Sequence, residues 1–528
     1  MLHERITDMK IRLIFCISAI IWLFPGCIQD QLVAQEPEQP NIIYILADDL
    51  GYGELGVYGQ QKIETPNLDR LAENGMKFTN HYAGSPVCAP TRYNLLTGKH
   101  AGNSYIRGNS ELPERGDVWN FEAMFENPEL EGQRPILPET ITIADKLKEA
   151  GYRTAAIGKW GNGGPGTEGH PNKHGFDLFY GYLCQRQAHT YYPTHLWRND
   201  ERIMLDNDLV DPHQPLPEGL DPYDPESYAM FHDQPDYSAK LMHEEAVRFI
   251  EDSSSDPFFL FLPTPIPHVS LQAPERWIDY YREKFGDEEP YYMGGTGYLH
   301  YTPARYPNAT YAAMISYLDE QVGEIVDKLK ELGLYENTLI MFSSDNGPLD
   351  GLGVDPVYFD SAAPFLGIRG WGKGMVREGG IRVPMIATWE NRIPAGSTTD
   401  HISAFWDVMP TLTDIAGVEP PEDIDGISFL PVLEGDEYNQ RRHDYLYWEF
   451  PGRGGQQAVR MGRWKGVRMD IISEGNLEVE LYDLVADPQE QHNVAGRYPA
   501  IRKRIEQIMT EARTPPELPE FRMPALGD

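Results

Sequence analysis

Cysteine is scarce in this sequence. The 528 residues include four cysteines, and two of them, Cys16 and Cys27, lie in or beside an apolar N-terminal leader. The rest of the chain keeps Cys88 and Cys184, so a framework of disulfides cannot be what stabilises it. These two could pair with each other, but a chemical role for one of them is the sharper hypothesis.

A long apolar run is also lacking, because the apolar stretch at 13–24 is too short to cross a membrane comfortably. It follows a positively charged start, which is the layout of a secretory signal. We therefore expect residues 1–35 to be a leader and the protein to be exported, either periplasmic or secreted. Cleavage after Ala34 would release a soluble protein, whereas cleavage before Cys27 would leave a lipid anchor as the one link to a membrane. In a third alternative, the uncleaved stretch anchors the chain.

Positive charge is scarce too. Lysine and arginine number 45 against 81 aspartates and glutamates, which gives a formal net charge of −36 at pH 7. Nucleic acids and anionic membrane surfaces are bound through lysine and arginine, so neither is an expected partner. The acidity is interpreted as a solubilising surface. If the substrate is an anion, the positive side chains that bind it must be gathered at one place.

What the sequence does contain is an alternation of strand-like and helix-like segments. Buried strands are predicted at residues 41–47, 154–157, 258–262, 339–343 and 385–388. Helices are predicted between Thr65 and Gly75 and at residues 141–150 and 310–332. This alternation predicts the α/β class, with a large, mostly parallel sheet sandwiched by helices.

The chain is too long for one ordinary domain. We expect a leader at 1–35, a large domain at 36–424 and a smaller α+β domain at 425–528, where short strands precede a helix. Two stretches of the large domain, 199–235 and 283–309, lack a clear period. Loops of this length in a compact domain are usually functional or disordered, and we interpret these as the rim of a substrate cleft.

Polar residues follow four of the predicted strands closely. They are Asp48, Asp49, Lys159, His268, Asp345 and Asn346. Ligands of such sheets bind beyond the carboxyl ends of the strands, so we expect these side chains to share one edge. Three carboxylates and an amide are oxygen donors that suit a hard divalent cation, and Ca²⁺ is expected in preference to Mg²⁺. The alternative is that the acidic residues are turn residues and helix caps.

One cysteine stands in the short motif Cys88-Ala89-Pro90-Thr91-Arg92. Pro90 suits the first turn of a helix, which places residue 88 at a helix N-terminus. Backbone N–H groups and the helix dipole favour an anion such as sulfate at that position. Arg92, one turn later, can reach the same place. Taken alone, Cys88 could also be a small buried residue.

This motif, followed by Leu95-Leu96-Thr97-Gly98-Lys99, resembles the signature of type I (formylglycine-dependent) sulfatases, which belong to the alkaline-phosphatase-like superfamily. Other motifs of that family are similar to Gly158-Lys159-Trp160, to Pro267-His268, and to Lys373 with Glu378-Gly379-Gly380-Ile381-Arg382-Val383-Pro384. The resemblance runs from Asn41 to Asn493 and covers nearly the whole chain after the leader.

The resemblance implies an arylsulfatase-like sulfuric ester hydrolase with its catalytic domain at 36–424. A separate maturation enzyme would oxidise Cys88 to Cα-formylglycine, whose hydrate is the nucleophile and a ligand of the metal. Arg92 would help to acidify that hydrate, while Lys159 and Lys373 would hold the sulfate. His268, or Lys373, would protonate the departing oxygen. Export and long rim loops favour a sulfated saccharide as substrate, with simple aryl sulfates as surrogates.

The chain departs from the family pattern at Gly161, where the usual G-K-W-H has a histidine. That histidine is generally assigned as the base that releases sulfate. Its absence leaves open which residue acts as the base in this step. His189 is our candidate replacement, with His170 and His174 behind it. His189 could equally bind substrate or pack against its neighbours.

Two other classes of protein are compatible with these motifs. A phosphonate or phosphate ester hydrolase can share the fold and the C-x-P-x-R motif. The missing histidine at position 161 is also compatible with a non-catalytic, glycan-binding relative.

Overall fold

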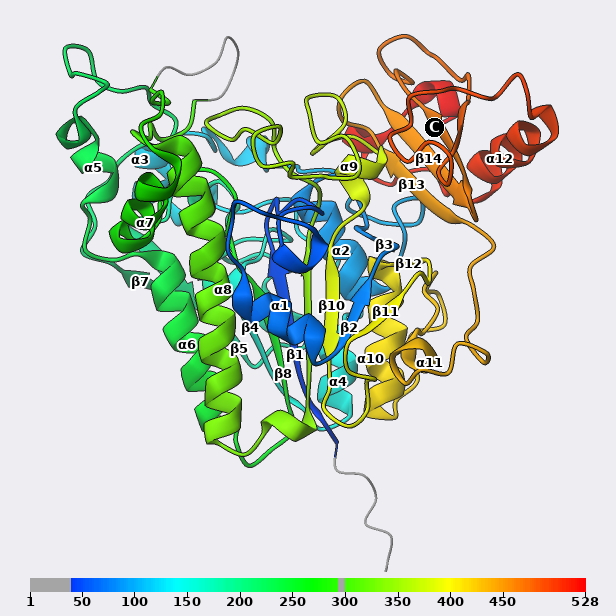
Figure 1. The fold of residues 1–528 in the computed structure, drawn as a ribbon, viewed down its shortest axis with the longest axis horizontal. Helices are drawn as coiled ribbons and strands as arrows, with labels where there is room; N and C mark the ends of the chain where they lie inside the picture. The colour runs from blue at the N-terminus through cyan, green and yellow to red at the C-terminus, as the bar shows by residue number, and fades with distance from the viewer. Residues whose placement is uncertain (1–38, 293–299) are drawn as a thin grey trace, which may run out of the picture. The chain divides into compact units, whose positions relative to one another are not determined.

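The structure, a computed structural model, describes residues 39–292 and 300–528 (Figure 1). The predicted leader at 1–35, with Cys27 and Ala34, lies outside the described residues, as does the part of the predicted rim at 293–299. Within the described ranges, none of the helices combines the length and the apolar character that a membrane crossing requires.

A ten-stranded sheet forms the centre of the molecule (Figure 1). In spatial order its strands are β11 (Ser397–Thr399), β2 (Met76–Phe78), β10 (Met385–Thr388), β9 (Thr338–Ser344), β1 (Asn41–Ala47), β8 (Phe258–Pro263), β4 (Arg153–Lys159), β5 (Leu178–Tyr182), β6 (His195–Arg198) and β7 (Glu201–Met204). The five strands from β9 to β5 are parallel, and β10, β6 and β7 add antiparallel neighbours. The predicted mostly parallel sheet is therefore confirmed.

Helices cover both faces of this sheet. The helices of the described residues are α1 (Pro66–Glu73), α2 (Cys88–Thr97), α3 (Phe121–Glu126), α4 (Ile143–Glu149), α5 (Ala229–His232), α6 (Ser238–Asp252), α7 (Glu275–Phe285), α8 (Pro307–Glu331), α9 (Glu378–Ile381), α10 (Val408–Ala416), α11 (Leu430–Leu433) and α12 (Pro499–Glu511). The last of these belongs to the C-terminal region, and several others lie at the rim. The predicted helices at 141–150 and 310–332 correspond to α4 and α8.

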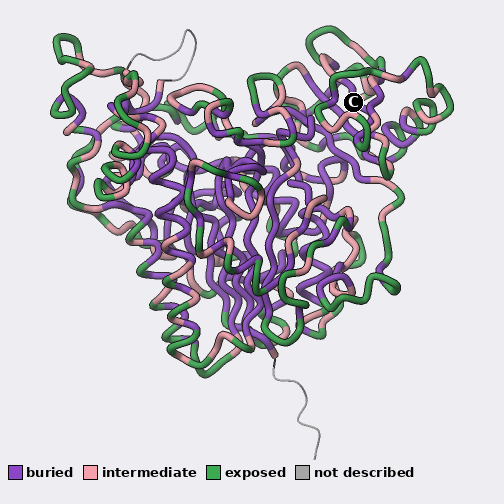
Figure 2. Tube along the Cα trace, viewed as in Figure 1, coloured by how far each residue is buried: buried purple, intermediate pink, exposed green. Residues whose placement is uncertain are grey.

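The sequence of β1 explains why two helical layers are needed. Successive side chains of a strand point to opposite faces, and all seven residues of β1 are buried. Ile43 and Ile45 pack in one core with α1, α6 and α8, whereas Ile42 and Tyr44 pack in a second core with α2, α4 and α10. A strand that is apolar on both faces is stable only when both are covered, as the buried centre of Figure 2 shows.

A second, smaller sheet lies in the C-terminal region (Figure 1). It is antiparallel and consists of β13 (Leu446–Phe450), β14 (Gln456–Met461), β15 (Trp464–Arg468) and β16 (Glu480–Asp483). One of its faces packs on α12, and the other packs against Tyr82, Ile381 and Trp406 of the preceding part of the chain. On that side Trp448 donates a hydrogen bond to the carbonyl of Ala83 (2.9 Å). The fold thus has the smaller α+β part that the sequence predicts, while its boundary at 424/425 stays a prediction.

A buried charge network joins the two parts. Lys465 of β15 is fully buried, and its Nζ lies 2.9 Å from Glu378 Oε1 and 3.2 Å from Glu490 Oε1. The backbone N–H of Glu378 donates to Glu490 Oε2 (2.7 Å). Removing one member of such a buried set typically costs about 3–5 kcal/mol, because the remaining charges lose their partner. The segment around Glu378 is therefore fixed by the C-terminal sheet.

The register of the parallel strands decides what meets at their carboxyl ends. Ala47, the last residue of β1, pairs with Ser344, the last residue of β9, and Leu46 pairs with Pro263 at the end of β8. The residues that follow these strands therefore emerge side by side at one edge of the sheet. Asp48 and Asp345 are the first of them.

Candidate active site

Cys88 lies at this edge, in the first turn of α2. Residue 87 is extended and α2 starts at Cys88, as Pro90 predicts, because a proline needs no hydrogen-bond acceptor in the first turn. Gly98 ends the helix with φ +70°, a conformation that favours glycine. The N–H of Ala89 donates to Asn109 Oδ1 (3.0 Å), which satisfies one free donor of the helix start.

Three polar side chains surround the Cys88 sulfur, which is 1% exposed. Its Sγ lies 3.4 Å from Asp48 Oδ1, 3.7 Å from Lys373 Nζ and 3.8 Å from Lys159 Nζ. Lys159 is the last residue of β4, while Lys373 comes from the long connection between β9 and α9. Residues that are far apart in the sequence thus meet at one sulfur atom.

Arg92 of α2 contacts two of the carboxylates at once. Its Nη2 lies 3.1 Å from Asp48 Oδ2 and 2.9 Å from Asp345 Oδ2, and its Nη1 donates to the carbonyl of Lys159. The side chain is fully buried, so these contacts are not weakened by water. The main role of Arg92 in this structure is therefore to hold Asp48 and Asp345 in position.

The lysines pair with the neighbouring aspartates. Lys159 Nζ lies 2.6 Å from Asp48 Oδ2, and Lys373 Nζ lies 2.7 Å from the Asp49 carboxylate. Asp49 adopts φ +68°, and its N–H donates to Asp345 Oδ1 (3.1 Å). All the residues that the sequence assigns to this edge are therefore in one connected cluster.

His268 borders the cluster on the side of Asp49. Its Nε2 lies 3.7 Å from Asp49 Oδ2, and its Nδ1 lies 2.5 Å from the carbonyl of Val269. A carbonyl only accepts, so Nδ1 carries a proton and Nε2 is the atom that faces the cluster.

The buried charges shift one another's pKa values. Burial acts to raise the pKa of Asp48, but Lys159, His268, Arg92 and Lys373 outweigh it and hold the value below the ordinary range. Burial and the Asp48 charge raise the pKa of Asp345 to about 7, and burial with Asp345 and Asp48 raises the pKa of the Cys88 thiol well above its usual value. Burial, Lys159 and Lys373 lower the pKa of His268 to about 4.

The donor set fits a hard divalent cation. The side chain of Asn346 donates from Nδ2 to Asp49 Oδ1 (2.8 Å), while its buried Oδ1 has no hydrogen-bond partner among the described residues. Ligand atoms of Asp48, Asp49, Cys88 and His268 all lie within 4.8 Å of one another. A group of crowded carboxylates, of which Asp345 has a raised pKa, together with a free amide oxygen is what a cation with oxygen ligands would satisfy.

Of the three histidines that the sequence offers as a base, the structure brings one to the cluster. The ring of His189 stacks on His268, with 5.4 Å between centroids and 10° between planes. His170 Nε2 instead lies 3.0 Å from the carbonyl of Asn199, and both ring nitrogens of His174 lie within hydrogen-bond distance of backbone carbonyls. His170 and His174 thus have structural partners elsewhere.

Gly161 has φ +82°, and its missing side chain leaves room for a neighbour. A Cβ at this position would lie 2.3 Å from Gln185 Nε2. Gln185 therefore occupies the space into which a histidine at 161 would extend.

Three residues near His189 were not singled out from the sequence. His189 Nδ1 lies 2.8 Å from His213 Nε2 and 3.3 Å from the Tyr301 hydroxyl, and the half-exposed ring of Trp119 packs against both imidazoles. His213 and Tyr301 belong to the stretches at 199–235 and 283–309 that the sequence predicts as a rim, so their position could have suggested them. No pattern in the sequence marks Trp119.

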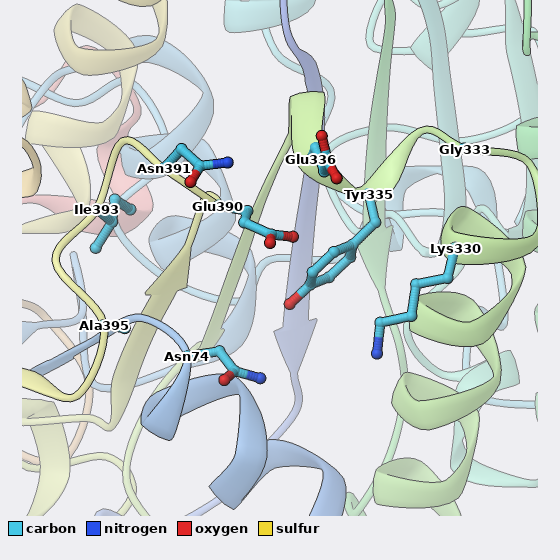
Figure 3. Close-up of a pocket in the computed structure, with 9 residues that line it drawn as sticks. All are labelled: Asn74, Lys330, Gly333, Tyr335, Glu336, Glu390, Asn391, Ile393 and Ala395. Atoms are coloured by element: carbon cyan, nitrogen blue, oxygen red, sulfur yellow. The ribbon is translucent and has the colours of Figure 1, made fainter.

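A separate pocket of about 680 Å³ opens at the opposite edge of the sheet, near the start of β9 (Figure 3). Lys330 Nζ lies 5.0 Å from the ring centroid of Tyr335, and Glu336 and Glu390 also line this pocket. None of the predicted site residues lines it, so the candidate active site remains the cluster around Cys88.

Comparison with known proteins agrees with these motifs. The profile of the family described as Sulfatase matches residues 40–418, and that of the N-sulphoglucosamine sulphohydrolase C-terminal region matches residues 367–514. The chain is similar to N-acetylgalactosamine-6-sulfatase of Canis lupus familiaris, with 31% identity over 446 residues that cover 82% of this chain and 72% of that protein. It is also similar to N-acetylgalactosamine-6-O-sulfatase of Bacteroides thetaiotaomicron, with 28% identity over 94% of this chain and 97% of that protein.

A solved structure has the same fold. It is the crystal structure of Ps i-CgsB in complex with k-i-k-neocarrahexaose, which matches with a TM-score of 0.70 and 27% identity. The match covers 92% of this chain and 94% of the other.

Proposed function

The chain belongs to the sulfatase family and is a sulfuric ester hydrolase, and we propose that it removes sulfate from sulfated saccharides at the cluster around Cys88. The observation that carries the proposal is the approach of Lys159 and Lys373 to the buried Cys88 sulfur. Arg92 and His268 belong to the same cluster through their contacts with its aspartates. Asp48, Asp49 and Asp345 balance the charges of Arg92, Lys159 and Lys373, so a bound divalent cation would supply the positive excess that a sulfate group requires.

The nucleophile is proposed to be the Cα-formylglycine that a separate maturation enzyme makes from Cys88. The raised pKa of the Cys88 thiol supports this, because a buried, protonated thiol is a poor nucleophile. The matured residue supplies a hydroxyl nucleophile in place of the thiol. Its position at the start of α2 directs backbone N–H groups and the helix dipole toward the sulfate.

Asp48, Asp49, Asp345 and Asn346 would hold one divalent cation, together with the matured residue 88. We propose Ca²⁺ rather than Mg²⁺, because the donors come almost entirely from the protein and Mg²⁺ usually keeps several waters. When bound, the cation supplies a positive charge that polarises the sulfate oxygens. Arg92 keeps Asp48 and Asp345 in position through its two carboxylate contacts.

Lys159 and Lys373 would bind the sulfate oxygens from two sides. Each Nζ already lies within 4 Å of the Cys88 sulfur, and each is held by an aspartate. Such prearranged charge stabilises a transferring anionic group without reorganisation during the reaction. Lys373 would donate the proton to the departing oxygen, and His268 could do so only in its protonated form, which its pKa of about 4 disfavours.

A saccharide as the alcohol part of the substrate is supported by the side of the site next to His268. Four aromatic side chains pack against one another there, namely His189, His213, Tyr301 and Trp119. Their ring faces can stack on a sugar, and their polar atoms can form hydrogen bonds with its hydroxyls. The relatives that are named for N-acetylgalactosamine 6-sulfate, and the hexaose complex of the solved structure, agree with this assignment.

Export is part of the proposal and is supported by the layout of residues 1–35. We propose that the protein is periplasmic or secreted, with a lipid at Cys27 as the alternative to cleavage after Ala34. Mass spectrometry of the N-terminal peptide from the native host distinguishes a lipidated Cys27 from a free N-terminus at residue 35.

The function is tested by sulfate release from defined sulfated oligosaccharides and from 4-nitrophenyl sulfate, with phosphate and phosphonate esters alongside. Faster turnover of a sulfated saccharide than of the phosphorus esters supports the proposal. Preferential turnover of a phosphonate ester would overturn it in favour of the related hydrolase class.

A further inference from the structure

A second pocket with an unusual charge lies between the C-terminal sheet and the segments that follow β2, β11 and α9. Its volume is about 510 Å³. It is lined by Asn80, Arg382, Asp400, His401, Ile402, Arg442, His443, Tyr445, Leu446, Arg460, Gly462, Arg463, Leu484 and Val485. Among these described residues Asp400 carries the one carboxylate, against four arginines and two histidines. None of the residues proposed for catalysis is among them.

The charges of two of the arginines are balanced by neighbouring carboxylates. Arg382 Nη1 lies 3.0 Å from Glu378 Oε2, and Arg463 Nε donates to Asp483 Oδ1 (2.7 Å). Their charges are therefore already balanced, and they contribute mainly the shape of the pocket.

The other two arginines are not balanced in this way. Arg460 is buried, and it donates from Nε to the carbonyl of Gly462 (3.1 Å) and from Nη1 to the Tyr82 hydroxyl, both of which are uncharged acceptors. Arg442 makes no ion pair with any residue in the described ranges. Two guanidinium groups with no direct carboxylate partner thus line the same pocket.

Two histidines also line the pocket. His443 Nε2 lies 2.7 Å from Asp407 Oδ1, and this contact raises the pKa of His443 against the effect of burial. His401 is buried, and its ring has no hydrogen-bond partner in the part of the chain that the structure describes. Burial lowers the pKa of His401, Asp407 opposes this, and Arg442 and His443 act in the same direction as burial. His401 is therefore a neutral side chain beside the charges of Arg442 and His443.

We propose that this pocket binds a sulfate group through Arg442, Arg460 and His401, at a place separate from the catalytic cluster. Guanidinium groups bind tetrahedral oxyanions with two parallel hydrogen bonds, and a neutral imidazole can donate a third. The pocket is larger than a sulfate ion, so it also has room for part of a sugar that carries the group. The bound group has two sources, namely free inorganic sulfate or a second sulfate of a glycan chain.

Binding is tested on crystals of the full chain soaked in selenate, which has the shape and charge of sulfate and scatters anomalously. The expected result is an anomalous peak within hydrogen-bond distance of Arg442 and Arg460, in addition to any peak at the catalytic cluster. A peak at the catalytic cluster with none in this pocket would overturn the proposal. The catalytic peak serves as an internal control that the anion has entered the crystal.

The two sources are separated by kinetics of the double variant Arg442→Gln/His401→Gln. If a glycan is the source, KM for a sulfated hexasaccharide rises about tenfold, because charge-assisted hydrogen bonds are lost, while kcat/KM for 4-nitrophenyl sulfate is unchanged. If free sulfate is the source, the selenate peak disappears and both kinetic constants stay at the wild-type value. A double variant that keeps the selenate peak contradicts the assignment of these residues.

The matched control is Arg504→Gln, which changes an exposed arginine of α12 in the same way. It is expected to leave the selenate peak and both substrates unaffected. The 4-nitrophenyl sulfate measurement also keeps this inference apart from the proposed function, because loss of that activity would point to the catalytic cluster instead.

Discussion

The imidazole of His189 lies parallel to that of His268, with 5.4 Å between the ring centroids. His268 in turn faces Asp49 at the edge of the catalytic cluster. His189 comes from the segment after β5, so it reaches the site from a different strand than the missing histidine of position 161 would. This contact makes His189 the residue whose role is most open to experiment.

Replacement of His189 by Gln is expected to lower kcat by about 100-fold, which is the lower end of what a general acid or base contributes. The measurement is steady-state turnover of 4-nitrophenyl sulfate. His170→Gln is the matched control, because His170 lies next to the carbonyl of Asn199 and should keep its activity. If His189→Gln changes only KM for a saccharide, the residue binds substrate and is not the base.

Replacement of Cys88 by Ala is expected to reduce turnover by at least about 10⁴-fold while the fold persists. The physical reason is that residue 88 is the proposed nucleophile and both lysines of the site lie within 4 Å of its sulfur. Thermal unfolding checks the fold, and peptide mass spectrometry of wild-type protein from the native host checks whether residue 88 is formylglycine. Cys184→Ala, at the other buried cysteine, should stay active. Retained activity in Cys88→Ala would exclude this residue as the nucleophile.

Introduction of the family histidine at position 161 is expected to destabilise this protein. A residue other than glycine at φ +82° costs about 1–2 kcal/mol, and Gln185 has to move as well. Chemical unfolding of Gly161→His should therefore show a lower free energy of unfolding than the wild type. The double variant Gly161→His/Gln185→Ala should recover part of the lost free energy of unfolding, since it removes the Gln185 side chain that the histidine would clash with. Equal stability of wild type and single variant would contradict the geometry.

Removal of divalent cations with a chelator is expected to abolish turnover and lower the thermal midpoint. A cation present at 100 times its dissociation constant stabilises the folded state by about 2.7 kcal/mol, and chelation removes this contribution. Ca²⁺ should restore both properties at a lower concentration than Mg²⁺. The variant Asn346→Ala should need more Ca²⁺ for the same recovery, because it removes the buried free amide oxygen. A chelated protein with full activity and unchanged midpoint would exclude a metal site here.

The contact between His443 and Asp407 predicts how stability depends on pH. Asp407 raises the pKa of His443 in the folded state above the ordinary value near 6.5, so the protonated ring favours folding. Its contribution is fully present below about pH 6.5, where the unfolded chain also binds the proton, and it is lost as pH rises through the folded pKa. Urea unfolding from pH 5.5 to 8.5 should show this loss in the wild type. His443→Gln should show a smaller loss over the same range.

The centre of the fold was predictable from sequence, because buried parallel strands are continuous apolar segments. The segment 41–47 coincides with β1, and 385–388 coincides with β10. α4 was predictable for a different reason, since Thr142 and Asp145 form a capping box at its start. The hairpin strand β7 falls inside the stretch interpreted as a loop, because its sequence is short and half-exposed and gives no apolar alternation.

The part of the candidate site that lies in sequence motifs was predictable. Asp48 and Lys159 follow apolar strands, so the parallel register alone brings them together. His213, Tyr301 and Trp119 come from segments whose path depends on tertiary packing, and no local pattern encodes their meeting with His189. The meeting of Arg442 with Arg460 and His401 in one pocket likewise depends on segments that only the folded chain brings together.

The buried contacts of Lys465 with Glu378 and Glu490 have a consequence for how the protein is made. Lys373 precedes Glu378 in the same connection, so its loop gains its final anchor only when β15 and the segment around Glu490 have been synthesised. A chain that ends before these residues would lack the lysine and the glutamate that fix the segment around Glu378. Truncated products of this gene are therefore expected to lack activity even when they contain every residue of the catalytic cluster.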